Sequence, residues 1–156
     1  DLNPDARRML DPDITFHEQD CSQPWPVGDL DFVFTSNFFE HLPSKDHLMR
    51  TLNAALGALK PGGTLICLGP NIRRIAGGYW DFWDHYLPLT ERSLEEAMKI
   101  AGFEVFECIG SFLPYSMSRG RRAPAWMVGL YLKIPLFWRV FGRQFLVAGR
   151  KPRPAS

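Results

Sequence analysis

With 156 residues, of which 46% are hydrophobic and 22% charged, the chain holds enough apolar material for one buried core and is too apolar for an intrinsically disordered class. Its three cysteines, Cys21, Cys67 and Cys108, lie far apart and form no CxxC pair. This pattern argues against a disulfide framework or a zinc site and favours a reducing cytoplasm. No uncharged apolar run reaches the ~18 residues that a transmembrane helix needs.

The formal net charge of +1 conceals an asymmetry. Residues 1–107 carry all 17 acidic side chains and 9 basic ones, a net charge of −8, whereas residues 108–156 carry 9 basic side chains and no acidic one. Such a basic tail favours acidic surfaces: the first half of the chain itself, phosphorylated substrates or anionic lipid head groups.

Two strands are predicted in the first part of the chain. Residues 14–20 (ITFHEQD) alternate in polarity and end at Asp20, as a strand does. A loop rich in proline follows, and residues 30–37 (LDFVFTSN) then form a nearly continuous apolar run, which is typical of a buried parallel strand.

Helices alternate with strands after this point. Ser44 is positioned to cap a helix whose apolar residues recur at helical spacing until the sequence KPGG ends it, and residues 64–71 predict a second buried strand. Thr90 caps the next helix, with Ser93 as a rival cap. Residues 103–113 and 143–152 predict two further strands. The alternation indicates an α/β sheet with mainly parallel strands.

The segments LDFVFTSNFFEHL, LKPGGTLICLGPN and LTERSLEEAMKIAGFEV, in this order, resemble a class I S-adenosylmethionine-dependent methyltransferase. The resemblance extends from Asp1 to about Pro152 and is strongest over residues 30–108. It implies a Rossmann-like methyltransferase sheet of seven strands in the order 3-2-1-4-5-7-6, mostly parallel with an antiparallel last strand. The strands predicted here then correspond to strands 3, 4, 5, 6 and 7 of that sheet.

In the family, strand 1, a glycine-rich loop, the first helix and most of strand 2 precede the residue that Asp1 resembles. The pairs Gly62–Gly63 and Gly77–Gly78 do not form a G-x-G-x-x-G motif. We therefore expect residues 1–156 to form a single methyltransferase-like domain that is incomplete at its N-terminus and impaired in activity. Loss of strand 1 exposes the edge of the strand at 30–37, which predicts homodimerisation or domain swapping along that edge.

The resemblance also implies S-adenosylmethionine as cofactor and S-adenosylhomocysteine as product. Asp1 would accept hydrogen bonds from the ribose hydroxyls, unless it is only a frayed terminus. Asp20 would accept from the adenine amino group beside the Cys21 backbone, or cap a turn. Trp25 would flank the adenine or anchor its own loop.

Ser36, Asn37 and Phe38 follow the middle strand, at the edge where ligands of open α/β sheets bind. We expect Asn37 and Phe38 to lie along the methionine portion of the cofactor, with Phe38 also able to flank the adenine. After them, Glu40 and His41 face the site or cap the next helix. His41 is a candidate general base, because methylating a hydroxyl requires removal of its proton, or a structural hydrogen-bonding residue.

Residues 77–90 (GGYWDFWDHYLPLT) gather aromatic side chains next to Asp84 and His85. The segment follows the second buried strand, so it should lie over the acceptor pocket, where aromatic rings stack on a sugar or planar ring. Asp84 and His85 then form a candidate pair for deprotonating an acceptor hydroxyl. The alternative is an aromatic lid that packs on the sheet, with Asp84 as a cap. No metal is indicated, because His17, His41, His47 and His85 show no ligand spacing.

Residues 115–142 read as an apolar and basic helical insertion, uncharged over 123–132 and interrupted at Pro135. It is too short to span a bilayer. It suits peripheral contact with an anionic membrane, a cap on the acceptor pocket, a dimer face or a plain helical excursion over the core.

The sequence thus predicts methyl transfer from S-adenosylmethionine to an oxygen, less often a nitrogen, of a small molecule, which we expect to be glycan-like or lipid-linked. A nicotinamide-dependent oxidoreductase is disfavoured, since no tyrosine has a lysine four residues later. A non-catalytic binding or membrane-associated module is the remaining alternative. We expect a cytoplasmic, optionally membrane-peripheral, homo-oligomer without a nucleic-acid partner.

Overall fold

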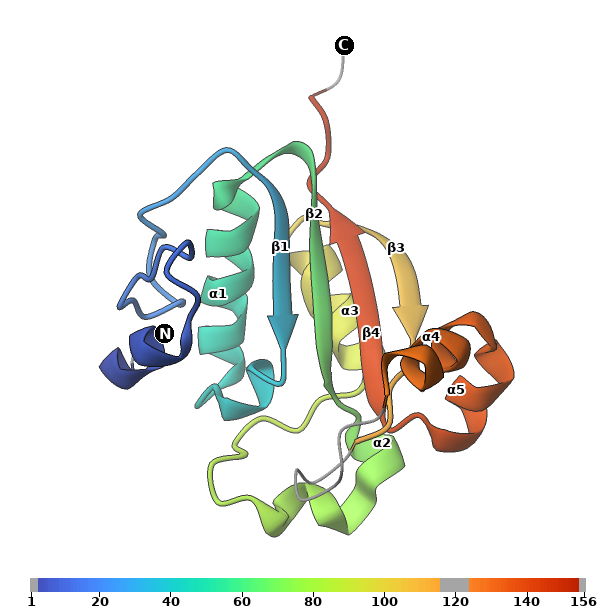
Figure 1. Ribbon diagram of the computed structural model, residues 1–156. Coiled ribbons are helices and arrows are strands. Elements are labelled where there is room, and N and C mark those ends of the chain that lie inside the picture. Colours follow the sequence, from blue (N-terminus) through green and yellow to red (C-terminus); the bar gives the residue numbers. More distant parts are fainter. Residues whose placement is uncertain (1–2, 116–123, 155–156) are drawn as a thin grey trace.

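The structure is a computed structural model that describes residues 3–115 and 124–154. Its sheet has four strands in the order β1-β2-β4-β3, formed by β1 (Leu30–Ser36), β2 (Leu59–Pro70), β4 (Gln144–Arg150) and β3 (Glu104–Ile109). β1 pairs parallel with β2, and β4 pairs antiparallel with both β2 and β3, so β4 alone runs in the opposite direction (Figure 1). The predicted order 4-5-7-6 and the antiparallel last strand are confirmed.

Two helices build the core on one face of this sheet. α1 (Lys45–Ala58) and α3 (Glu91–Ile100) bury apolar side chains in a single cluster with alternate residues of β1, β2 and β4. Both predicted caps are present: Ser44 Oγ accepts from the His47 N–H at 3.3 Å, and Thr90 Oγ1 accepts from the Ser93 N–H at 3.1 Å. The Ser93 Oγ atom in turn accepts from the Thr90 N–H at 3.0 Å. Ser93 therefore completes a capping box and is not the residue that starts the helix.

The second face of the sheet is largely uncovered in the described part of the chain. Phe32, Phe34 and Phe106 point to it and are each about half exposed, whereas Val33, which points to the helical face, is buried. The prediction that residues 30–37 form a strand is confirmed, but the prediction that both of its faces are buried is wrong. The apolar run reflects a strand with one packed face and one open face.

The predicted strand at 14–20 is also corrected, because residues 15–20 have no regular secondary structure and pair with no described strand. Ile14, which the alternation placed on a buried face, is 54% exposed. Alternating polarity suggests a strand only if a neighbouring backbone supplies hydrogen-bond partners, and β1 finds its only described partner in β2. The N-terminal segment, with a 3-10 helix at Pro4–Met9, lies beside α1 instead (Figure 1).

The KPGG sequence does more than end α1. β2 begins at Leu59, immediately after the helix, and runs through the two glycines. Gly62 has a φ of 83°, and a Cβ on Gly63 would lie 2.9 Å from the carbonyl oxygens of Leu30 and Lys60. Glycines at these positions allow the start of β2 to approach β1 closely.

The carboxyl ends of β1 and β2 meet at one edge of the sheet, at the bottom of Figure 1. A short 3-10 helix (Phe39–His41) follows β1, and α2 (Ile72–Ile75) and another 3-10 helix (Ala76–Asp81) follow β2. This edge therefore brings together two chain segments that the sequence singled out.

The predicted insertion at 115–142 lies partly outside the described residues. Its described part forms α4 (Ala125–Lys133) and α5 (Pro135–Phe141), which meet at Ile134 next to β3 and β4 (Figure 1). Tyr131 donates to the Phe112 carbonyl at 2.6 Å and fixes α4 there. Within the described ranges, no helix has the length and apolar character that crossing a membrane requires.

Candidate active site

A cleft of about 1070 Å³ opens at the carboxyl end of β1, between the N-terminal segment and α1. Every described residue predicted to bind the cofactor lines it: Asp20, Cys21, Ser36, Asn37 and Phe38. The Trp25 and His41 side chains line the same cleft. Asp1 lies outside the described residues. The structure therefore gathers the predicted cofactor residues around one cavity.

Asp20 both caps a turn and faces the cleft, so the two interpretations of this residue are compatible. Its Oδ1 atom accepts from the Ser22 N–H at 2.8 Å. Hydrogen bonds from Ser22 hold the pKa of the Asp20 carboxyl below its usual value, so the group is an ionised acceptor at neutral pH. Beside it, the Cys21 carbonyl accepts from Trp25 Nε1 at 3.0 Å, and this bond fixes the indole ring at the cleft.

The chain turns sharply where β1 ends. Asn37 has a φ of 48°, in the left-handed region, and its N–H donates to the Leu68 carbonyl at 3.1 Å. Asparagine tolerates this conformation better than most residues because its short polar side chain bonds locally. The turn directs Ser36, Asn37 and Phe38 toward the cleft instead of along the sheet.

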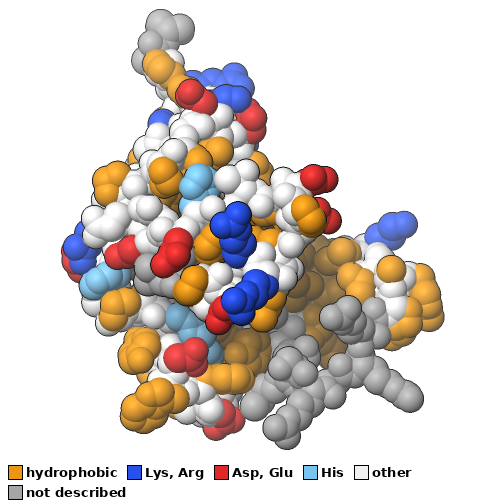
Figure 2. Space-filling view, turned by 60° about the vertical axis from the view of Figure 1, so that its left-hand side comes forward, with side chains coloured by type: hydrophobic (Ala, Val, Ile, Leu, Met, Phe, Trp, Pro, Cys, Tyr) orange, Lys and Arg blue, Asp and Glu red, His pale blue; other side chains and the backbone are white. Residues whose placement is uncertain are grey.

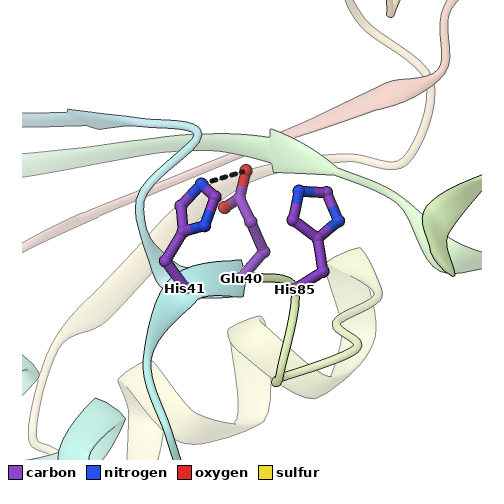
Figure 3. Close-up of side chains that lie close together, drawn as sticks. All are labelled: Glu40, His41 and His85. Carbon is purple, nitrogen blue, oxygen red and sulfur yellow. Dashed lines mark ion pairs between the residues drawn. The ribbon is translucent and has the colours of Figure 1, made fainter. Parts of the chain in front are cut away.

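A second group of polar side chains lies next to the cleft. Glu40, His41 and His85 come from two segments, and their side chains point the same way in Figure 3, with one possible ligand atom from each lying within 4.8 Å of the others. Glu40 and His85 are buried, with exposed fractions of 3% and 5%, whereas His41 is at the surface. We call Glu40, His41 and His85 the Glu-His cluster.

Backbone hydrogen bonds hold the two segments of the Glu-His cluster together. The Glu40 carbonyl accepts from the N–H groups of Tyr86 and Leu87, at 2.8 and 3.1 Å. The buried Tyr79 hydroxyl donates to the Leu87 carbonyl at 2.6 Å. The position of His85 relative to Glu40 is therefore set by main-chain contacts rather than by flexible side chains.

Burial controls the protonation of this cluster. It raises the pKa of Glu40 to about 7, an effect that nearby Asp84 increases and His41 opposes. Burial also lowers the pKa of His85, so its imidazole is neutral at physiological pH. His85 Nδ1 lies 2.9 Å from the Tyr79 carbonyl, which can only accept, so Nδ1 carries the proton and Nε2 holds the lone pair.

The predicted pairing of Asp84 with His85 does not form. Asp84 instead contacts His41, whose Nδ1 lies 3.1 Å from both the Asp84 Oδ2 atom and the Asp84 carbonyl. Asp84 lies in a turn that the His85 N–H closes by donating to the Phe82 carbonyl at 3.4 Å, and His85 Nδ1 bonds the Tyr79 carbonyl instead of Asp84. The structure thus brings together all three residues predicted to be catalytic, but it assigns Asp84 to His41.

The aromatic segment at 77–90 divides into a buried and an exposed part. Tyr79 is fully buried, and the Phe82 ring stacks on His85 with centroids 4.8 Å apart. Trp80 and Tyr86 are more than half exposed, and Trp83 is 94% exposed. Figure 2 shows hydrophobic side chains protruding at this lower end of the molecule, near a histidine and carboxylates. Contact of these rings with an acceptor stays a prediction.

The sequence did not reveal that Glu40 is a central residue of the site. The sequence predicts only that Glu40 faces the site or caps a helix, whereas its carboxyl is the most buried member of the Glu-His cluster. The available signal was the Glu-His pair directly after a strand, together with a histidine after the next strand. The distance between these segments along the chain conceals their contact in the fold.

Comparison with known proteins gives matches to a family model and to solved structures. A family model described as a methyltransferase domain matches residues 1–107. A SAM-dependent methyltransferase from Archaeoglobus fulgidus has a similar structure, with 19% identity and a TM-score of 0.63 over 97% of this chain and 74% of that chain. The methyltransferase complex with the Trm112 activator from Haloferax volcanii contains another, with 22% identity and a TM-score of 0.63 over 97% and 67%.

A third similar structure is the N-methyltransferase NodS from Bradyrhizobium japonicum WM9 in complex with S-adenosyl-L-homocysteine, with 13% identity and a TM-score of 0.59 over 98% of this chain and 65% of that chain. At these identities the likeness establishes a shared fold. No protein of curated function matches the sequence.

Proposed function

Because this chain belongs to the class I S-adenosylmethionine-dependent methyltransferase family, we propose that it transfers a methyl group from S-adenosylmethionine to a small-molecule acceptor. The cleft at the end of β1 is the observation that carries this proposal. S-adenosylhomocysteine is then the product. The cofactor supplies a methyl group on a positively charged sulfur, and the protein's task is to hold the acceptor atom in line with it.

The residues around the cleft fit such a cofactor. The ionised Asp20 carboxylate accepts hydrogen bonds from an amino or hydroxyl group, and the fixed Trp25 ring offers a flat apolar surface to adenine. Ser36 and Asn37 offer polar groups where β1 ends, which suits the amino-acid portion. No glycine lines the cleft in the described part of the chain, so contacts come from side chains, and we expect weakened binding and impaired turnover.

We assign proton removal from an acceptor hydroxyl to His41, Asp84 and His85. His41 is best placed, because it lines the cleft and the Asp84 carboxylate orients its ring. The exposed rings of Trp80, Trp83 and Tyr86 suit stacking on a glycan-like or lipid-linked acceptor.

Calorimetric titration with S-adenosylhomocysteine tests the cofactor site. We expect binding in the micromolar range that Asp20→Ala abolishes, because this change removes the ionised acceptor from the cleft. Asp13→Ala is the matched control, since Asp13 is exposed and does not line the cleft. If the chain does not bind, or if Asp20→Ala binds equally well, the proposed cofactor site is wrong.

A second role, peripheral contact with an anionic membrane, is favoured by α4 and α5. They expose a set of large apolar side chains on a part of the chain that has no acidic residue: Trp126, Met127, Val128, Leu130, Leu132, Leu136, Val140 and Phe141. Lys133 and Arg139 lie among them. Apolar burial and attraction to anionic lipid heads act together on such a surface.

Co-sedimentation with lipid vesicles tests this second role. We expect binding to vesicles with anionic lipids, weakening with salt, and a marked loss in Trp126→Ser. Equal binding to neutral vesicles would contradict it. Vesicle binding without S-adenosylhomocysteine binding would favour the alternative of a non-catalytic membrane-associated module over an enzyme.

We further propose that the chain forms homodimers along β1. β1 lies at the edge of the described sheet, with Phe32 and Phe34 half exposed beside that edge. Light scattering at micromolar concentration should give twice the chain mass, and a monomer would argue against this contact.

The described cysteines form no disulfide, which supports a cytoplasmic setting.

A further inference from the structure

We propose that Glu40, His41 and His85 bind a single Zn²⁺ ion through one carboxylate oxygen and two imidazole nitrogens. Two histidines and one glutamate form one of the ligand sets of catalytic zinc sites, which keep a position open for water or substrate. Zinc binding by this cluster does not depend on the proposed methyl transfer. Only its consequence for the acceptor rests on that function.

The first argument is the convergence of the ligand atoms. They lie within 4.8 Å of one another, whereas the edges of a tetrahedral zinc site are about 3.4 Å long when bonds are about 2.1 Å. A closure of about 1.4 Å at the longest separation completes the site. His41, whose side chain is 38% exposed, has room to make this movement, while Glu40 and His85 are held by the surrounding core.

The second argument is the state of the two imidazole rings. His85 Nδ1 donates to the Tyr79 carbonyl, and His41 Nδ1 faces the Asp84 carbonyl and carboxylate. Both rings therefore keep the Nε2 lone pair for a ligand. Histidines that bind metals usually have this outer hydrogen bond from the other ring nitrogen to a carbonyl or carboxylate.

The third argument is the isolation of the Glu40 carboxylate. It is 97% buried, yet its nearest cationic partner among the described residues is His41 Nε2, at 4.0 Å. This distance is too long for a hydrogen bond, and within residues 3–115 and 124–154 the donor identified for this carboxylate is the Glu40 backbone itself. A buried anion without a close partner is costly, and a bound cation removes that cost.

The ligand types select the ion. Imidazole nitrogen suits zinc and similar transition metals, whereas Mg²⁺ and Ca²⁺ prefer oxygen ligands. Because His41 also lines the cleft, the ion would lie at the border of the cofactor cavity. There it would lower the pKa of an acceptor hydroxyl and replace His41 as the means of proton removal.

Calorimetric titration of ZnSO₄ into the full chain, first treated with a chelator, tests the site. We expect one ion per chain, and affinity at least tenfold weaker in Glu40→Gln and in His41→Ala. Asp84→Asn, which removes the carboxylate that faces His41 Nδ1, should weaken binding about tenfold. MgCl₂ should give no comparable binding.

Matched controls separate this site from other zinc ligands. His17→Ala and Cys21→Ser remove possible ligands outside the Glu-His cluster and should leave the affinity unchanged. Zinc should raise the melting temperature of the wild type but not of His41→Ala, whose exposed ring makes this variant a safe test of a folded protein. No binding, more than one ion per chain, or loss of binding in Cys21→Ser would overturn the proposal. None of these titrations contains a cofactor, so their failure is distinct from failure to bind S-adenosylhomocysteine.

Discussion

Two buried glutamates lie at the same end of the sheet, and their surroundings differ. Glu91 begins α3, and its carboxylate accepts from Asn71 Nδ2 at 2.6 Å and from Arg73 at 2.9 Å. Glu40 is more deeply buried, but its nearest cationic group in the described structure is His41, at 4.0 Å. Among the residues that the structure describes, the Glu91 carboxylate has close partners with a positive charge or a donor group, and the Glu40 carboxylate has no cationic group closer than 4.0 Å.

The difference separates a structural residue from a residue available for a ligand. Asn71 also donates to the Gly110 carbonyl, so Glu91 ties the end of β2 to α3 and to the segment after β3. A Cβ on Gly110 would lie 2.8 Å from the Glu91 carboxyl carbon, so the chain is shaped around this side chain. In the described part of the chain Glu40 has no comparable network, which is the expected state of a site whose partner arrives from outside.

The largest expected effect is that of Glu91→Ala. It leaves the fully buried Asn71 amide without its shortest acceptor and unpairs Arg73, so we expect a loss of about 3 kcal/mol in the free energy of unfolding, measured in urea. Glu96→Ala, an exposed change on the same helix, should stay within about 0.5 kcal/mol. Equal losses of unfolding free energy in Glu91→Ala and Glu96→Ala would contradict the structural role of Glu91.

The next effect is a pH dependence that only Glu40 should produce. Its pKa is raised in the folded, metal-free protein, so the stability is full at low pH and falls as pH rises from about 4.5 toward about 7. His41 and Asp84 face this carboxyl and act in opposite directions. Against Glu40→Gln, which stays neutral, the wild type should lose about 2 kcal/mol between pH 5 and pH 8.

Chemical unfolding of both proteins in the presence of a chelator measures this difference. Curves of stability against pH that run parallel would show that Glu40 is compensated in the fold, as Glu91 is. In the wild type, bound zinc should prevent the loss of stability between pH 5 and pH 8, because the ion supplies the missing positive charge.

The smallest effect concerns the hydrogen bond from the Tyr79 hydroxyl to the Leu87 carbonyl, which lies behind the Glu-His cluster. Tyr79→Phe leaves the Leu87 carbonyl without its buried donor and should lower the free energy of unfolding by about 1 kcal/mol. Tyr86→Phe is the control, because the Tyr86 side chain is 55% exposed. A larger loss in Tyr86→Phe would mean that the exposed rings, and not Tyr79, hold this segment.

Local chemistry made much of the fold predictable. Ser44 and Thr90 were identifiable as caps because the residues that follow them supply N–H groups from which their hydroxyls accept hydrogen bonds. The order of the described strands followed from the resemblance. The strand at 14–20 failed because polarity alternation cannot reveal whether a pairing partner exists. The open face of β1 was missed for the same reason: Phe32 and Phe34 look like core residues in the sequence.

The sequence predicted where most of the site residues lie, but it did not predict which side chains contact each other. Ser36 and Asn37 line the cleft because they follow the carboxyl end of β1, whereas Asp20 lines it from an irregular segment and not from the predicted strand. The partner of Asp84 depends on where a loop returns, so adjacency to His85 was misleading and His41 was the actual contact. Their roles in binding and catalysis stay predictions.

Amide NMR of the isotopically labelled chain during addition of S-adenosylhomocysteine tests the central claim most directly, because it reports both binding and location. The account predicts saturable chemical-shift changes centred on Asp20, Cys21 and the 36–38 turn, which Asp20→Ala removes. Unchanged spectra, or changes confined to α4 and α5, would contradict it.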